Sequence, residues 1–445
     1  MKFHIITMGC QMNVADANWL ARSLTARGFD QADSDQADCI ILLTCSVREK
    51  PELKVASLLG RLAELRLTRP DAFVAVGGCV AQQLGATLWN RFPMVRLVFG
   101  ADGIQSAPQA IARLVDEPHV RLSLLDFTDS YPERAQDWPH DRVAPLAFVT
   151  IMQGCDNFCA YCIVPFVRGR QKSRHREAIL TECRELVARG AREVTLLGQN
   201  VNSYGQDASG DGTSFAALLR DVAAIPGLLR LRFTTSHPKD LSDDVIACFA
   251  ELPQLGSSLH LPVQSGSDAV LKSMGRRYTV ADYRRLVDKL RRARPDIALT
   301  TDLIVGFPGE TEEDFQQTLS LVREVGFESG FSFMYGDRPG TASEHMEPKI
   351  SQEEKSARLA ILQELLNARL AASLAAQVGT RQAVLIEGQS KRGAAGTFWR
   401  GRDPAGRIVN LPLPEGDDYV GRIVTARILL AKKHSLIGEA EADHD

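Results

Sequence analysis

The feature that most constrains the fold is a repeated alternation of short apolar runs with amphipathic helical segments. In the middle of the chain the apolar runs fall at residues 146–152, 193–198, 229–234, 258–263, 297–305 and 328–335, and a last helical segment covers about 351–376. Alternating strands and helices are typical of a parallel sheet covered by its helices. Six such units in succession predict a partial or complete parallel (β/α)6 barrel, with an open doubly wound sheet as the alternative.

The flanking regions predict two further domains, so the fold class is mixed α/β. Apolar runs at 3–8, 39–43 and 73–76, each followed by a helical segment, predict an N-terminal parallel α/β domain. After residue 377 the β-branched runs at 383–386, 406–410 and 421–430, broken by glycines, predict a small antiparallel β-barrel. The expected organisation is 1–115 for the first domain, 116–144 for a Pro-rich linker, 145–377 for the barrel and 378–441 for the last domain.

Composition and charge narrow the class of protein. With 44% hydrophobic and 24% charged residues, the chain is unlike disordered, fibrous or disulfide-stapled proteins. It has neither a secretory h-region nor an apolar run of eighteen residues, which predicts a cytoplasmic protein that makes no membrane contact. In a reducing compartment its nine cysteines are expected to be metal ligands and buried thiols.

Three cysteines, Cys155, Cys159 and Cys162, form a C-x3-C-x2-C loop directly after the first expected barrel strand. Three thiolates so close together can surround one metal centre, and on a cubic four-iron cluster they leave one iron without a protein ligand. That open iron is a position where another molecule can bind. The alternative is a structural zinc site completed by a histidine such as His175, although zinc sites commonly use paired C-x2-C knuckles.

A second trio, Cys10, Cys45 and Cys79, follows the ends of the three strands expected in the N-terminal domain. The carboxyl ends of parallel strands share one edge of a sheet, so these cysteines are expected to converge there. This arrangement predicts a second cluster with three protein ligands. The other cysteines lie at apolar periodic positions and are expected to be buried thiols: Cys39, Cys183 and Cys248.

Motifs around both trios resemble those of the radical S-adenosylmethionine (SAM) methylthiotransferases. The C-x3-C-x2-C spacing, with the aromatic Tyr161 before the third cysteine, is similar to that of the radical SAM superfamily. The segments at 9–13, 44–50 and 77–81 resemble the methylthiotransferases in particular. Later segments resemble the branch that modifies isopentenylated tRNA: 197–201, 232–238, 259–267 and 304–311.

This resemblance implies two 4Fe–4S clusters and SAM as both methyl donor and source of a 5′-deoxyadenosyl radical. The implied product carries a methylthio group at C2 of N6-isopentenyladenosine beside the tRNA anticodon. The implied partners are tRNA, an electron donor such as flavodoxin or ferredoxin, and an unknown sulfur donor. The alternatives are methylthiolation of threonylcarbamoyl-adenosine in tRNA or of a ribosomal-protein aspartate, or a non-catalytic, metal-stapled RNA-binding protein.

Candidates for SAM binding are Tyr161 and polar or flexible residues at the ends of barrel strands. Barrel enzymes bind ligands at that face, although each such residue can instead serve in a turn or helix cap. The strand-end candidates are Gln199, Asn200, Gln264, Ser265 and Gly306.

Two basic regions are candidates for RNA contact, because the chain as a whole carries a net charge of −3. Residues 379–438 hold ten Lys or Arg and five Asp or Glu, a net charge of +5, and the resemblance implies that this region is an RNA-binding TRAM domain. The second region leaves the cluster loop, where Arg168 and Arg170 either contact tRNA or pair with barrel carboxylates. The candidate contacts in the last domain are Lys391, Arg392, Trp399, Arg400 and Arg402, with Trp399 either stacking on a base or filling a core.

Overall fold

Six parallel strands form the sheet of the N-terminal domain, in the order β2-β1-β3-β4-β5-β6. β3 (Cys39–Thr44) and β4 (Phe73–Gly78) are buried at every position, because helices cover both faces of the sheet. Ile41 and its alternate neighbours enter one core, whereas Ile40 and its alternate neighbours enter the other. The remaining elements are β1 (Lys2–Thr7), α1 (Gln11–Ala26), β2 (Asp30–Gln31), α2 (Glu49–Ala63), α4 (Cys79–Leu84), α5 (Thr87–Arg91), β5 (Val95–Phe99), α6 (Ala107–Asp116) and β6 (Leu122–Leu124).

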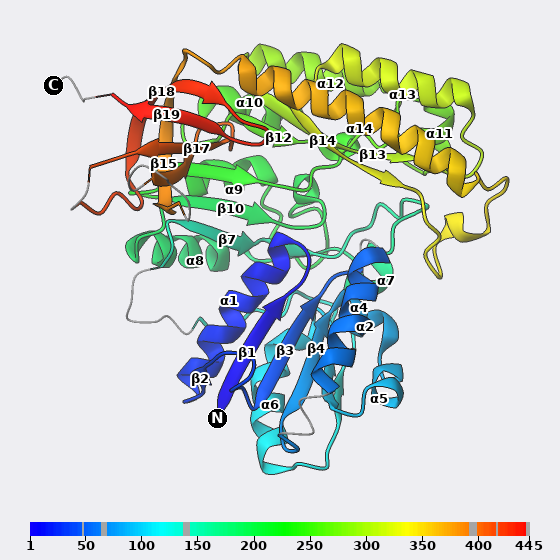
Figure 1. Ribbon diagram of the computed structural model, residues 1–445, viewed down its shortest axis with the longest axis vertical. Coiled ribbons are helices and arrows are strands. Elements are labelled where there is room, and N and C mark those ends of the chain that lie inside the picture. The colour runs from blue at the N-terminus through cyan, green and yellow to red at the C-terminus, as the bar shows by residue number, and fades with distance from the viewer. Residues whose placement is uncertain (47–48, 64–68, 137–142, 391–397, 415–416, 442–445) are drawn as a thin grey trace.

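The computed structural model describes residues 1–46, 49–63, 69–136, 143–390, 398–414 and 417–441. Figure 1 shows the N-terminal sheet in blue below the central domain, and the small C-terminal barrel in red at the opposite side of that domain. Among the described helices, none is long and apolar enough to cross a membrane.

Two three-stranded parallel sheets, β11-β10-β7 and β12-β13-β14, build the central domain. A parallel bridge between Leu231 of β11 and Leu255, just before β12, joins them into an open barrel of six strands. The predicted partial barrel is therefore confirmed. Its elements are β7 (Leu146–Thr150), β8 (Met152–Gln153), α7 (Val164–Arg168), β9 (Lys172–Ser173), α8 (Arg176–Ala188), β10 (Glu193–Leu197), α9 (Phe215–Ala223), β11 (Arg230–Phe233), α10 (Asp243–Glu251), β12 (Ser258–His260), α11 (Asp268–Ser273), α12 (Val280–Ala293), β13 (Ala298–Val305), α13 (Glu312–Val325) and β14 (Ser329–Met334).

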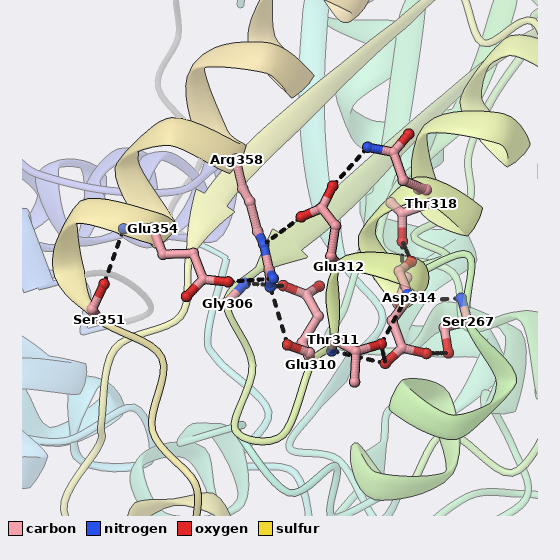
Figure 2. Close-up of polar contacts among 12 residues, drawn as sticks. Ser267, Gly306, Glu310, Thr311, Glu312, Asp314, Thr318, Ser351, Glu354 and Arg358 are labelled. Atoms are coloured by element: carbon pink, nitrogen blue, oxygen red, sulfur yellow. Dashed lines mark hydrogen bonds and ion pairs between the residues drawn. The ribbon is translucent and has the colours of Figure 1, made fainter.

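The long helix α14 (Gln352–Ala375) packs along β14 and leads into the C-terminal barrel (Figure 1). A buried ion pair holds its first turns to the central domain, as Figure 2 shows. Arg358 donates to the Glu310 carboxylate at 2.7 Å and to the Glu310 carbonyl at 3.1 Å, and also pairs with Glu354. The Glu310 carboxylate accepts the Gly306 N–H at 2.5 Å, so this pair fixes the loop after β13 against α14.

Five strands close the C-terminal barrel, in the order β15-β16-β17-β19-β18. The predicted small β-barrel is confirmed, and its pairs are antiparallel except β17 with β19, which run parallel. Arg230 and Arg232 each donate to the Asp403 carbonyl, at 3.1 and 2.9 Å, and Arg407 pairs with both oxygens of Glu328 at 3.0 and 2.6 Å. This barrel is thus docked at the amino ends of the central strands. Its strands are β15 (Arg381–Gln389), β16 (Phe398–Arg402), β17 (Ile408–Pro412), β18 (Ile423–Ala431) and β19 (Leu436–Ala440).

Candidate functional site

The cysteine trio of the central domain lies on the loop that joins β8 to α7, at the carboxyl end of the first barrel strand: Cys155, Cys159 and Cys162. Hydrogen bonds hold the loop on two sides, since the Cys155 N–H donates to the Gly169 carbonyl at 3.3 Å and the Ala160 N–H to the Met274 carbonyl at 2.9 Å. The loop is therefore anchored both to the segment that follows it and to the far side of the barrel.

Gly154 makes the sharp entry into this loop possible. Its φ is +77°, and a Cβ at this position would lie 2.0 Å from the Arg170 carbonyl oxygen. Only glycine combines this conformation with so close a contact.

The chemistry of the central trio fits a cluster. Burial raises the pKa of Cys155 to about 11 and that of Cys162 to about 12, and the charge of Cys159 acts on both thiols. Metal binding requires the deprotonated thiol, so a positively charged metal centre is what would displace these protons. Three thiols on one short loop are the donor set of a 4Fe–4S cluster with one open iron.

Two side chains that the sequence did not single out lie against this trio. The buried Arg276 donates to the Cys159 Sγ at 3.4 Å and to the Tyr278 hydroxyl at 3.0 Å. The His237 Nε2 lies 4.0 Å from the same Sγ. Burial and then the charge of Arg276 lower the pKa of His237 to about 2, so its ring is neutral. In the sequence, His237 appeared only as one residue of the 232–238 motif. No hydrophobic periodicity or motif pointed to Arg276.

The structure brings the N-terminal trio to one edge of the sheet. Cys10 follows β1, Cys45 follows β3 and Cys79 begins α4 directly after β4, and these three strands are neighbours. A Cβ at Gly9 would lie 2.4 Å from the Cys45 Cβ and 3.4 Å from its Sγ, so the two chain segments meet closely only because residue 9 is glycine.

The pKa of Cys10 is lowered to about 5. The largest cause is a hydrogen bond from the Cys45 thiol, followed among the stabilising effects by the positive charge of Arg168 and the N–H groups of Asn13 and Met12. Cys10 is exposed, whereas Cys45 and Cys79 are buried. Because the thiolate is the form that binds metal, Cys10 is prepared to be a ligand.

Arg168 does not lie on the surface, which corrects the prediction that it contacts tRNA. Only 4% of the residue is exposed. Its Nε donates to the Cys79 Sγ at 3.4 Å and its Nη2 to the Asn13 Oδ1 at 3.2 Å. A phosphate could not reach this guanidinium without displacing the packing around it, because the side chain lies between the N-terminal and central domains.

The two trios adjoin each other through α7. Cys79 packs against Ile163 and Val167, which lie at the start and near the end of the short helix that follows Cys162. One cysteine of the N-terminal domain therefore lies against the helix that follows the central cysteine loop.

Comparison with known proteins identifies the family. Family models match residues 2–100 (Uncharacterized protein family UPF0004), 149–322 (Radical SAM superfamily) and 375–440 (TRAM domain). The tRNA-2-methylthio-N(6)-dimethylallyladenosine synthases of Nitratidesulfovibrio vulgaris and Oleidesulfovibrio alaskensis are 58% and 56% identical to the chain, each match covering 98% of both sequences. The chain belongs to this synthase family. It is a radical SAM enzyme of the methylthiotransferase class, and its family implies SAM and a 4Fe–4S cluster.

Solved structures share the fold at low sequence identity. The radical SAM methyltransferase TsrM from Kitasatospora setae, with cobalamin and a [4Fe-4S] cluster bound, superimposes with a TM-score of 0.57 at 16% identity. The match covers 77% of this chain and 74% of that one. This match supports the fold of the methylthiotransferase. Membership in the family follows from the synthase relatives.

Two of the SAM candidates of the methylthiotransferase lie beside the central cysteine loop. Gln199 accepts the Gly154 N–H at 2.6 Å and also contacts the Met12 sulfur of the N-terminal domain. The Asn200 Nδ2 donates to Asp240 at 2.7 Å. Both side chains thus position the loop and its surroundings.

The other SAM candidates differ in their placement. Ser265 is fully buried with its Oγ 3.3 Å from the Thr318 Oγ1, which favours its alternative role in a turn. Gln264 has a φ of +73° in the same turn, and Gly306 has a φ of +71° in the loop after β13. Phe307, next to Gly306, packs in one cluster with Tyr161, so that loop reaches the cysteine loop.

The predicted stacking role of Trp399 is also corrected. Its side chain is buried in the core of the C-terminal barrel, with its ring centroid 5.3 Å from that of Tyr419. Trp399 is thus a core aromatic, because the base-stacking face is already covered by protein.

The basic candidates for RNA contact are partly engaged with the protein. Arg402 pairs with Glu387 at 2.6 Å, and Arg400 lies 3.5 Å from the same carboxylate. The side chain of Arg170 is 73% exposed beside the cluster loop and pairs with Asp156 at 2.8 Å. Lys391 and Arg392 lie outside the described residues.

Proposed function

We propose that the enzyme adds a methylthio group to C2 of N6-isopentenyladenosine next to the tRNA anticodon. In this proposal two 4Fe–4S clusters are held by the two cysteine trios, and SAM is both methyl donor and radical source. When bound, these groups supply the radical that removes the C2 hydrogen, together with the methylated sulfur that replaces it.

The observation that carries the proposal is the junction between the trios. Cys79 packs against Ile163 and Val167 of the helix that begins just after Cys162. Sulfur insertion needs the radical source and the sulfur carrier at one substrate, and a shared junction meets that requirement. Relatives named as synthases of 2-methylthio-N(6)-dimethylallyladenosine support the choice of substrate.

The protein's own residues hold the arrangement rigid. Gln199 links the entry of the central loop to Met12 of the N-terminal domain. The buried Lys172 pairs with Asp102, and Gln153 contacts the same carboxylate, so a second bridge joins the two domains beside the loop. We infer that these contacts keep the two sets of cysteines at a fixed separation and help to exclude water.

The partners follow from the same chemistry. The TRAM domain and the exposed Arg170 would contact the tRNA backbone, and a small electron carrier such as flavodoxin or ferredoxin would reduce the clusters. Because its proposed substrate is tRNA, we expect the enzyme to act in the cytoplasm.

Nucleoside mass spectrometry tests the substrate. In a strain that lacks this enzyme, the methylthio derivative should disappear from tRNA while its N6-isopentenyladenosine precursor accumulates. Loss of a methylthio-threonylcarbamoyl nucleoside instead, or of a modified ribosomal aspartate, would reject the proposed substrate in favour of an alternative. Retention of all three marks in a strain without another methylthiotransferase would reject methylthio transfer.

A further inference from the structure

One buried arginine lies against each cysteine trio. The Arg168 Nε is 3.4 Å from the Cys79 Sγ, and the Arg276 Nη1 is 3.4 Å from the Cys159 Sγ. Each of the two arginine residues is only 4% exposed. The two sites therefore share one motif, a desolvated guanidinium that donates to a cysteine sulfur.

In the part of the chain that the structure describes, neither guanidinium forms a direct ion pair with a carboxylate; the charge of Asp16 acts on Arg168, but Asp16 itself pairs with Arg134 at 2.7 Å. Arg168 otherwise donates to the Asn13 side-chain oxygen and to the Met12 sulfur, and Arg276 to the Pro262 carbonyl and the Tyr278 hydroxyl. Neutral acceptors do not cancel a buried charge, and an uncompensated buried charge is strongly unfavourable. Among the side chains that these guanidinium groups contact, the cysteine sulfurs are the ones that become anionic when a metal centre binds.

A cluster bound by three thiolates would provide that charge. Reduction by one electron adds a negative charge, which a nearby cation stabilises, and N–H···S hydrogen bonds act in the same direction. Removal of the cation should therefore make reduction harder. The effect should be confined to the cluster that the arginine touches, because Coulomb energy falls with distance.

Arg168 differs from Arg276 in where it comes from. It ends α7, six residues after Cys162, yet its guanidinium reaches a cysteine of the other domain. The charge beside the N-terminal trio is thus delivered by the element that leaves the central cluster loop, so that trio receives it only when the domains are docked.

We propose that Arg168 and Arg276 are positioning residues that set the reduction potentials of the N-terminal and the central cluster, respectively. The inference rests on the proposed function, since it requires both clusters. It assigns to each arginine an electrostatic role, with the electron supplied by an external reductant.

Redox titration followed by electron paramagnetic resonance tests the role of each arginine separately. In full-length enzyme carrying Cys155→Ala, Cys159→Ala and Cys162→Ala, only the N-terminal cluster remains. There Arg168→Gln should shift the midpoint potential to a more negative value, Arg168→Lys should keep most of the wild-type value, and Arg276→Gln should have no effect. In the converse background, with Cys10, Cys45 and Cys79 replaced by alanine, Arg276→Gln should produce the shift and Arg168→Gln should not.

A matched control separates charge from loosened packing. The double variant Asp102→Asn/Lys172→Gln removes a buried ion pair between the same two domains without removing a group that contacts a cysteine. An equal shift in this control, or an unchanged potential in Arg168→Gln, would overturn the inference. Iron and sulfide are counted in every sample, and the potential is read from the loaded fraction. If the enzyme with Cys155, Cys159 and Cys162 replaced by alanine, and with Arg168 unchanged, holds no N-terminal cluster, the result rejects the proposed two-cluster function. It would then not be a test of the role of the arginine.

Discussion

At the cluster site, the available space restricts which residue types fit as much as the chemistry does. Gly154 has a φ of +77° and no room for a Cβ, whereas Gly212 has a φ of +79° with nothing within 4 Å of its Cβ position. The two glycines share a backbone conformation and differ in crowding. They therefore make a matched pair.

Gly154→Ala should disrupt the central cysteine loop, because the added methyl group meets the Arg170 carbonyl. We expect iron content to fall from about eight to about four per chain, the content of one remaining cluster. Gly212→Ala should cost about 1 to 2 kcal/mol for the backbone conformation alone and leave the iron content unchanged. Full iron loading in Gly154→Ala would contradict this account of the loop.

Cys79→Ala should remove a ligand of the N-terminal cluster and lower the iron content to about four per chain. Cys183→Ala is the matched control, since Cys183 is fully buried in the central core away from both trios. That control should lose some stability and keep about eight irons. Iron and sulfide analysis after anaerobic reconstitution measures the cluster content of the two variants. Equal iron content in Cys79→Ala and Cys183→Ala would remove Cys79 from the ligand set.

Sequence reasoning located the cysteines but not the groups around them. Cys10, Cys45 and Cys79 could be placed together because the ends of parallel strands share an edge, a rule that needs no side-chain detail. The roles of Arg168 and Trp399 were misjudged because their burial depends on how one domain packs against another, or how a small barrel closes. Such contacts produce no hydrophobic periodicity in the sequence, so the pattern cannot predict this burial.

At the scale of elements, the loop after β13 depends on α14 through the Glu310 and Arg358 pair (Figure 2). Both side chains are buried, so breaking the pair leaves an uncompensated charge. Arg358→Met should therefore lower the free energy of unfolding of the central domain by about 3–5 kcal/mol.

Urea unfolding followed by far-ultraviolet circular dichroism measures this loss. The double variant Glu310→Leu/Arg358→Met removes both charges and should recover most of the stability. Arg113→Ala is the control, because its pair with Glu117 is exposed to solvent and should matter little. If Arg358→Met were as stable as the wild-type enzyme, the pair of Glu310 and Arg358 would not be what holds α14.

Fully apolar runs were among the strands that sequence patterns predicted. β3 and β4 are buried at every residue and were expected almost to their ends. β16 alternates Phe398, Arg400 and Arg402 with buried positions on a small barrel, and β5 carries Arg96 in its middle. These strands were missed because neighbouring strands, rather than their own composition, stabilise them.

At the scale of the whole molecule, the C-terminal barrel and the cysteine loops occupy opposite ends of the central strands. The barrel docks through Arg230, Arg232 and Arg407 at the amino ends, whereas the loops lie at the carboxyl ends. In Figure 1 the C-terminal barrel and the N-terminal domain accordingly flank the central domain. A bound tRNA must span that distance to be held at both places.

Backbone contacts by the C-terminal barrel should appear as salt dependence. Lys432 and Lys433 are exposed in the turn between β18 and β19. Lys432→Ala/Lys433→Ala should weaken tRNA binding and reduce the slope of log affinity against log salt by about 1 to 2. Fluorescence anisotropy at several salt concentrations measures the slope. Lys289→Ala, on the outer helix α12, should leave it unchanged, and equal effects of the two substitutions would argue against a specific RNA surface.

The account rests on both trios acting on one nucleoside, and one measurement tests this directly. Anaerobically reconstituted enzyme is incubated with SAM, a reductant, a sulfide source and tRNA containing N6-isopentenyladenosine, and the digested nucleosides are analysed by mass spectrometry. Wild-type enzyme should form the 2-methylthio product. The variant with Cys10, Cys45 and Cys79 replaced by alanine should still cleave SAM to 5′-deoxyadenosine yet form none. Methylthio product from that variant at the wild-type rate would contradict the account.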